Sequence, residues 1–287
     1  PNIPLNITNK NKLLLEKKDQ KLRHYVIKNG FSEGINFPFM GNKENNSIKV
    51  DNPLDSNRKY LRTNLQKSLI ENLLYNERRQ KDSIKIFEFS DVYTLDACIN
   101  KTKVGIIASG HMGHDHINFS KKIDDKFITN LFKDLFKDNE LKCNLISRDG
   151  LDTKIKNHIY YIEFNIEDLK DDIGIEIDKT LMLNKFIQYK PISEFPTSNR
   201  DFSFLVSNFS NIEEIFRLFQ NMNDEHLKDS FMFDFYKNEK NNELKIGYRM
   251  IFQSNIKTLS DKDIQKSISK LLEPILAIDG VSIPGKE

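Results

Sequence analysis

Three histidines and one carboxylate lie within six consecutive positions and could bind a metal ion. The run is His111-Met-Gly-His114-Asp115-His116. Imidazole nitrogens and carboxylate oxygens are suitable ligands for zinc or nickel, so one interpretation is a metalloprotein centred on His111, His114 and His116. Structural zinc sites more often have cysteine ligands or wider, paired spacing, and this run contains a glycine. The other interpretation is therefore an ordinary solvated loop.

Polar and aromatic residues in the C-terminal third of the chain have types that suit RNA binding. An aromatic ring stacks on an unpaired base, a contact worth roughly 1–3 kcal/mol, and cations neutralise phosphates. We predict that RNA contacts come from Arg200, Asp201, Ser203, Tyr236, Lys245 and Arg249. Two simpler interpretations stay open. Arg200 and Asp201 could form a local salt bridge that braces a loop, and Arg249 could be a solvated charge.

These residues need a sheet with one open face to bring them together. Apolar residues alternate from Arg200 onward and again over 231–236 and 244–252, which predicts three strands. Helices are predicted over 212–220 and 261–272, and a last short strand over 277–283. The order β-α-β-β-α-β is the ferredoxin-like arrangement, with both helices on one face of a four-stranded antiparallel sheet. We expect this domain to occupy residues 190–287, with the polar set on the other face.

The N-terminal part of the chain has the pattern of a second α+β module. Gly30 follows the first predicted helix, and Pro38 ends the strand after it. We expect a mostly antiparallel sheet in a module over residues 16–185, after an extended lead-in over 1–15. The predicted helices cover 17–28, about 65–79 and 125–136, and the predicted strands cover 84–93, 103–108, 142–147 and 158–164.

Length and composition limit the class of protein. A chain of 287 residues is long enough for two domains, and because it opens on Pro1 we expect a piece of a longer protein. A net charge of +2 is too small to indicate a polyanionic partner by itself, so RNA binding requires local patches. Two distant cysteines, Cys98 and Cys143, fit a reducing cytoplasm. No apolar run approaches the roughly 20 residues of a membrane span, so no membrane partner is expected.

Several sequence blocks resemble one family in their residues and their order. Asn52-Pro-Leu54, Leu61-Arg-Thr-Asn-Leu65 and Phe87-Glu88 resemble the catalytic-like module of the β subunit of bacterial phenylalanine–tRNA ligases, which has a class II synthetase-like fold. Later blocks resemble the ferredoxin-fold anticodon-binding module that ends the same subunit. They are Phe195-Pro-Thr-Ser-Asn-Arg-Asp-Phe-Ser-Phe-Leu-Val206, Phe233-Asp-Phe-Tyr236, and Phe252-Gln-Ser254 with Thr258-Leu-Ser-Asp261.

The resemblance implies a role as a subunit of an aminoacyl-tRNA ligase. Its partners would be a catalytic α subunit, in an α2β2 heterotetramer, and tRNA(Phe). The whole enzyme would use ATP and magnesium. The helix–Gly–strand–Pro pattern also resembles the first motif of class II synthetases, which is a dimer interface in that family. On this resemblance, Phe31, Pro38 and Arg62 are expected at the subunit interface.

The resemblance does not extend to the catalytic groups of class II enzymes. Those enzymes hold ATP with one arginine on a second motif and another after a glycine-rich strand, because guanidinium groups stabilise the charge of the triphosphate. Here the corresponding strand ends Asp91-Val-Tyr-Thr-Leu95, and the sequence has neither Gly-x-Gly-x-Gly followed by arginine nor a P-loop. We therefore expect no catalytic residue and no bound cofactor in this chain. A stand-alone RNA-binding pseudo-synthetase is an alternative function.

Overall fold

The computed structural model describes residues 10–95, 97–137, 141–175, 191–238 and 243–284. The chain divides into two compact units, each described below by itself. Unit 1 comprises Pro1–Gly110 and Ile123–Phe186, and unit 2 comprises His111–Lys122 and Ile187–Glu287. The segment His111–Lys122, called the inserted segment below, groups with the C-terminal unit. No sequence pattern predicts this grouping.

Unit 1 is built on a five-stranded sheet with the order β1-β4-β5-β7-β6. Among these strands β1 pairs with β4 in parallel, and the other neighbours pair antiparallel. This confirms the predicted mostly antiparallel sheet of an α+β module. The strands are β1 (Ser32–Glu33), β4 (Ser83–Thr94), β5 (Ala97–Gly110), β6 (Asn144–Ile146) and β7 (Ile159–Asn165).

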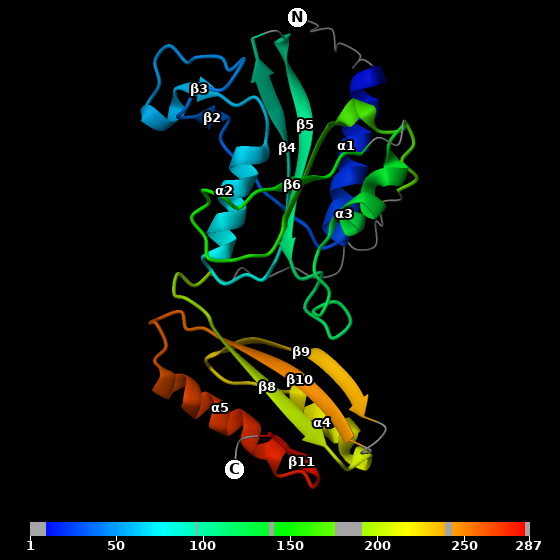
Figure 1. The fold of residues 1–287 in the computed structure, drawn as a ribbon, viewed down its shortest axis with the longest axis vertical. Helices are drawn as coiled ribbons and strands as arrows, with labels where there is room; N and C mark the ends of the chain where they lie inside the picture. Colours follow the sequence, from blue (N-terminus) through cyan, green and yellow to red (C-terminus); the bar gives the residue numbers. More distant parts are fainter. Residues whose placement is uncertain (1–9, 96, 138–140, 176–190, 239–242, 285–287) are drawn as a thin grey trace, which may run out of the picture. The chain divides into compact units, whose positions relative to one another are not determined.

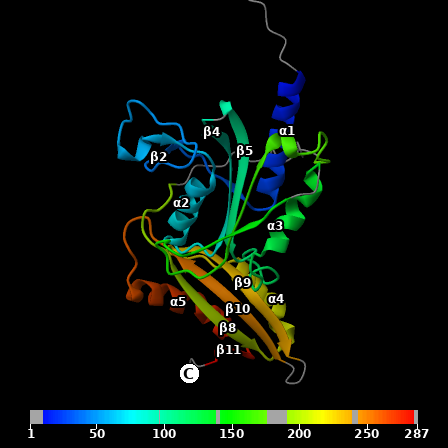
Figure 2. The ribbon, with the colours of Figure 1, turned by 45° about the horizontal axis from the view of Figure 1, so that its top comes forward.

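Helices cover both faces of this sheet (Figures 1 and 2). On one face, the Phe132 ring of α3 contacts the rings of Tyr25 on α1 and Phe164 on β7, with centroids 6.4 Å apart in both pairs. On the other face, Leu69 and Leu73 of α2 are fully buried. Both faces of the sheet are therefore packed by apolar side chains. The helices are α1 (Lys10–Lys28), α2 (Gln66–Glu77) and α3 (Asp125–Phe132).

The first helix begins earlier than predicted. α1 begins at Lys10, inside the stretch predicted to be an extended lead-in over 1–15, and residues 1–9 lie outside the described part of the chain. The segment from Lys10 to Leu15 contains only lysine, asparagine and leucine. Lysine and leucine are good helix formers, so propensity extends the helix beyond the part whose apolar spacing is recognisable.

Unit 2 has the predicted ferredoxin-like topology. Its four-stranded sheet has the order β11-β8-β10-β9, and all of its neighbouring strands pair antiparallel. The last strand is shorter than the predicted 277–283, because α5 continues through Pro274 and Gly280 then turns the chain at φ +77°. The elements are β8 (Ser198–Val206), α4 (Ile212–Gln220), β9 (Leu227–Asn238), β10 (Glu243–Phe252), α5 (Asp261–Leu276) and β11 (Val281–Ser282).

Both helices of unit 2 pack on one face of its sheet. Phe204 of β8 and Ile246 of β10 are fully buried there with Ile215 of α4 and Ile275 of α5. Because side chains alternate along a strand, burial of the even-numbered positions of β10 directs Lys245 and Arg249 to the opposite face. The register of the sheet therefore sets which side chains can meet a ligand.

Two further expectations concern membranes and cysteines. Among the described helices, none combines the length and the apolar character needed to cross a bilayer. Cys143 is a free cysteine, and burial raises the pKa of its thiol to about 11. The side chain of Cys98 lies outside the described part of the chain.

Candidate nucleic-acid interface

The guanidinium of Arg249, on the open face of the unit 2 sheet, forms an ion pair within the sheet. Arg249 of β10 lies directly opposite Asp201 of β8. The guanidinium donates from Nε to Oδ1 at 2.6 Å and from Nη2 to Oδ2 at 2.7 Å, a bidentate ion pair. The Arg249 side chain is only 16% exposed. Arg249 is therefore not the solvated charge that one interpretation predicted, and its cation is already neutralised.

An aromatic cluster covers the same region of the face. Phe119, from the inserted segment, places its ring centroid 4.8 Å from the Arg249 guanidinium and 5.5 Å from the centroids of both Phe231 and Phe233. His114 stacks on Phe231 with centroids 5.0 Å apart and ring planes 11° from parallel. Sequence reasoning missed this contribution because the segment lies about 110 residues away from β9 along the chain.

The remainder of the open face keeps three predicted residues accessible. Tyr236 of β9 lies directly opposite Lys245 of β10. The exposed fraction of Tyr236 is 58%, and Lys245 and Ser203 are also exposed. Ser203 lies opposite Gly247, where a side chain would collide with the Phe233 ring at 2.8 Å. An exposed ring beside an ammonium group is the arrangement that stacks and neutralises a single-stranded nucleotide.

Arg200 braces the start of α5. Its Nη2 lies 2.9 Å from Asp261 Oδ1, and its Nη1 donates to Ser198 Oγ at 2.7 Å. The salt bridge between Arg200 and Asp201, one of the two interpretations of these residues, does not form, because each has a different partner. Neighbouring residues in a strand point to opposite faces, which explains why the two side chains diverge.

The histidine run is part of a turn packed by aromatic rings. The His111 ring stacks on Phe119 with centroids 4.0 Å apart, and its Nδ1 faces the Phe119 carbonyl. Hydrogen bonds from Asn118 and from the Ile117 amide hold the pKa of the Asp115 carboxyl below its usual value. Among the described residues, no three His, Cys, Asp or Glu side chains are grouped so as to hold a metal ion. The metalloprotein interpretation is therefore not supported.

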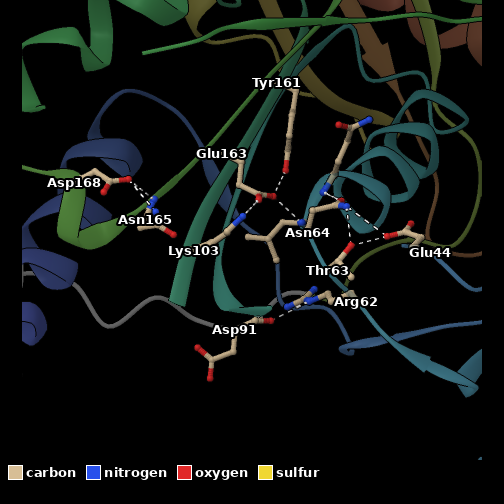
Figure 3. Close-up of polar contacts among 12 residues, drawn as sticks. Glu44, Arg62, Thr63, Asn64, Asp91, Lys103, Tyr161, Glu163, Asn165 and Asp168 are labelled. Atoms are coloured by element: carbon tan, nitrogen blue, oxygen red, sulfur yellow. Dashed lines mark hydrogen bonds and ion pairs between the residues drawn. The ribbon is translucent and has the colours of Figure 1, made fainter. Parts of the chain in front are cut away.

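The sheet face beneath α2 in unit 1 is filled by leucines. A Cβ built on Gly105 would lie 2.8 Å from Leu69 Cδ1 and 2.9 Å from Leu65 Cβ. Beside them, the Glu163 carboxylate accepts from Lys103 Nζ at 2.6 Å and from the Leu65 amide at 2.7 Å (Figure 3). The Tyr161 hydroxyl also donates to Glu163. The pKa of Tyr161 is raised, mainly by burial and next by the negative charge of Glu163. At Gly105, therefore, leucine side chains occupy the sheet surface.

Two of the three residues expected at a subunit interface are buried in unit 1 itself. Phe31 is 3% exposed and Arg62 is 2% exposed, and Arg62 Nη1 pairs with Glu88 Oε1 at 2.9 Å. Both side chains already contact this chain, and the expectation that they also meet a partner subunit stays a prediction. Pro38 is partly exposed, and between Phe31 and Pro38 the side chains of Ile35 and Phe37 are 92% and 73% exposed. Sequence reasoning missed these two residues, although they alternate with Asn36 in the same block.

Comparison with known proteins identifies both units. The family described as the phenylalanyl tRNA synthetase beta chain CLM domain matches residues 3–145, and the ferredoxin-fold anticodon binding domain matches residues 193–281. A pyrrolysyl tRNA synthetase from Desulfitobacterium hafniense matches 54% of this chain and 64% of its own at 14% identity, with a TM-score of 0.36. A structural likeness at that level does not bear on function.

Similar proteins include several phenylalanine–tRNA ligase beta subunits. The one from Francisella tularensis subsp. tularensis is 27% identical over 87% of this chain and 35% of its own length. Those from Mycoplasma mycoides subsp. mycoides SC and Buchnera aphidicola are 25% and 26% identical over 95% and 92% of this chain. These matches cover 39% and 37% of those two proteins. The chain thus spans little more than a third of the length of these relatives.

Proposed function

Because this chain belongs to the family of phenylalanine–tRNA ligase β subunits, we propose that it supports a catalytic α subunit and binds tRNA(Phe) during ATP-dependent aminoacylation. The observation that carries the proposal is the exposed pair formed by Tyr236 and Lys245 on the anticodon-binding sheet. The Tyr236 ring provides a stacking surface for an unpaired base, and the Lys245 ammonium lies beside it to neutralise a phosphate. Ser203 adds a hydroxyl that donates to or accepts from a base edge.

Catalysis is assigned to the partner subunit. ATP and magnesium belong to the reaction of the whole enzyme, and the residues of unit 1 do not fit them. Leu65 and Leu69 occupy the sheet face beneath α2, and the nearby Lys103 cation is already paired with the Glu163 carboxylate. Arg62 is engaged by Glu88 and the Asp91 carbonyl. These features support a chain that contributes recognition and assembly, with no step of the chemistry on its own residues.

The segment between Phe31 and Pro38 is the proposed contact with the α subunit. Ile35 and Phe37 expose two large apolar side chains on a short stretch that follows the edge strand β1. Large apolar side chains that are exposed next to one another often mark a surface that contacts another protein. An α2β2 heterotetramer in the cytoplasm, where tRNA charging takes place, completes the proposal.

Co-purification tests this function directly. The intact protein that carries this chain is affinity-purified from its source cell, and the eluate is probed for an α subunit and for tRNA(Phe). We expect both to co-purify, and the Ile35→Asp/Phe37→Asp variant to lose the α subunit while its circular dichroism spectrum is unchanged. Leu145→Asp is the matched control, since Leu145 is 59% exposed on β6 of the same unit. The Leu145→Asp variant should still co-purify with the α subunit.

Two outcomes would contradict the proposal. If the double variant still retains the α subunit at the wild-type level, the contact lies elsewhere. If no α-like subunit is found and the protein alone binds tRNA, the stand-alone RNA-binding alternative is the correct function.

A further inference from the structure

A cavity of about 530 Å³ lies in unit 1, outside the two interfaces proposed above except for its rim at Asn36 and Phe37. Its walls come from the first two turns of α2, from the short strand β2 (Phe39–Met40), which pairs with β3 (Tyr60–Leu61), and from loops on either side of these strands. Its volume falls within the roughly 300–1,000 Å³ of small-molecule sites.

A buried guanidinium lines this cavity and has one unused donor group. Arg62 donates from Nε to the Asp91 carbonyl at 3.3 Å and from Nη1 to Ser68 Oγ at 3.3 Å, besides its ion pair with Glu88. Its Nη2 is buried without a hydrogen-bond partner among the described residues. A buried donor without an acceptor costs about 1–3 kcal/mol, and more on a charged group, so an acceptor in the cavity would be favoured once a small movement of the Arg62 side chain brings Nη2 to it.

Opposite charges lie at the same cavity. Lys67 and Glu71 are both exposed, both line it, and their spacing of four residues places them on one face of α2. Glu88 stands behind Arg62, where it also accepts from Asn36 Nδ2 at 2.8 Å. The two cations of the site are therefore balanced by two carboxylates. The site therefore offers a polyanion such as a nucleoside triphosphate no net positive charge, whereas a ligand with one charge of each sign would be complementary.

The remaining lining residues fit the body of a small organic ligand. Phe37, Phe39 and Met40 supply apolar surface, and asparagine amides supply donors and acceptors. We propose that this cavity binds a small zwitterion of the α-amino-acid type. Its carboxylate lies toward Arg62 and Lys67, its ammonium lies toward Glu71, and its side chain packs on the phenylalanine rings. This inference does not rest on the proposed function.

Calorimetric titration of the intact protein, with any subunit that co-purifies, tests the site. A non-hydrolysable aminoacyl-adenylate analogue is added first to saturate a catalytic site on a partner, and the twenty common amino acids are then titrated singly. We expect at least one to bind once per copy of this chain. Lys67→Ala and Glu71→Gln should each weaken that binding at least about tenfold. Both residues are exposed, so the melting temperature of each variant should be unchanged.

Controls separate this site from other causes of binding. Lys126→Ala removes an exposed lysine on α3 and should leave the affinity within about twofold of the wild type. Analogues of the bound amino acid that lack the amino or the carboxyl group should bind at least about tenfold more weakly. The proposal is overturned if no amino acid binds at roughly millimolar concentration, or if neither variant changes the affinity. Failure of the α-subunit contact would leave this readout unaffected.

Discussion

At the scale of single residues, exposure and pairing separate the side chains that can meet RNA from those that cannot. Six residues of unit 2 have suitable chemistry, yet the bidentate pair between Arg249 and Asp201 uses two of them and the brace to Asp261 uses Arg200. A cation that already has a carboxylate partner gains little from a phosphate, because the exchange breaks one ion pair to form another. Tyr236, Lys245 and Ser203 stay accessible.

Tyr236→Ala is predicted to weaken binding of tRNA(Phe). Loss of one base–aromatic stack costs roughly 1–3 kcal/mol, which is about five- to 150-fold in the dissociation constant. Tyr236→Phe keeps the ring and should stay within about threefold of the wild type. Filter binding or fluorescence anisotropy at fixed salt measures both variants. Equal affinities for wild type and Tyr236→Ala would remove this ring from the interface.

At the scale of elements, α5 is held by a capping box at its N-terminus. Ser260 Oγ accepts from the Asp263 amide at 3.3 Å, and Asp263 Oδ2 accepts from the Ser260 amide at 3.0 Å. Side-chain hydrogen bonds from Lys257 and then from Ser260 hold the pKa of the Asp263 carboxyl well below its usual range. The ionised form is thus favoured in the folded state.

This lowered pKa predicts a pH dependence of stability with a definite sign. Because the folded pKa is below the unfolded one, ionised Asp263 stabilises the fold above the ordinary aspartate pKa of about 4, and this contribution is lost as the pH falls through the lowered value. Asp263→Asn should therefore lower the melting temperature at neutral pH and make it less sensitive to pH below about 4. Glu225→Gln, an exposed carboxylate in the same unit, is the control. If the melting temperatures of wild type and Asp263→Asn changed equally with pH across the acid range, the proposed stabilisation by ionised Asp263 would be contradicted.

The inserted segment is the element with the largest effect on the candidate interface. Its Phe119 ring packs against Arg249, Phe231 and Phe233, so part of the sheet that strand periodicity leaves open is covered. The three histidines of this segment thus contribute to packing, as the stacks of His111 on Phe119 and of His114 on Phe231 illustrate. An imidazole engaged in stacking does not need a metal to explain its position.

At the scale of the whole molecule, net charge limits how this chain binds a nucleic acid. A charge of +2 over 287 residues produces no strong general attraction for RNA, so specific cations must supply it. Each cation that pairs with a phosphate of a single strand adds about 0.7 to the slope of log affinity against log salt concentration. The number of such ion pairs is therefore measurable.

Lys245→Ala is predicted to reduce this salt slope by the amount expected for about one phosphate, whereas Arg249→Ala should change it by less. The reason is that Lys245 is exposed beside Tyr236, while the Arg249 cation is neutralised by Asp201. Titrations of tRNA(Phe) at several salt concentrations measure both slopes. A larger change for Arg249→Ala than for Lys245→Ala would show that the ion pair opens to bind RNA.

The sequence by itself determined the order of the elements. The alternation of apolar residues along β8 and β10 and the helical spacing over 212–220 specify strands and helices locally, because each buried face repeats with the period of its own element. The α+β class, the ferredoxin-like arrangement and the family resemblance follow from these local patterns and from blocks of adjacent residues.

Only the tertiary structure decided which of the candidate residues are free to act. The pairing of Arg249 with Asp201, the cover of Phe119 and the burial of Phe31 and Arg62 depend on contacts between positions that are distant along the chain. Periodicity assigns a side chain to one face of its own element and carries no information on what packs against that face. Accessibility and charge pairing are properties of the packed chain. Which of the predicted residues are exposed and unpaired enough to bind a ligand therefore follows only from the packing.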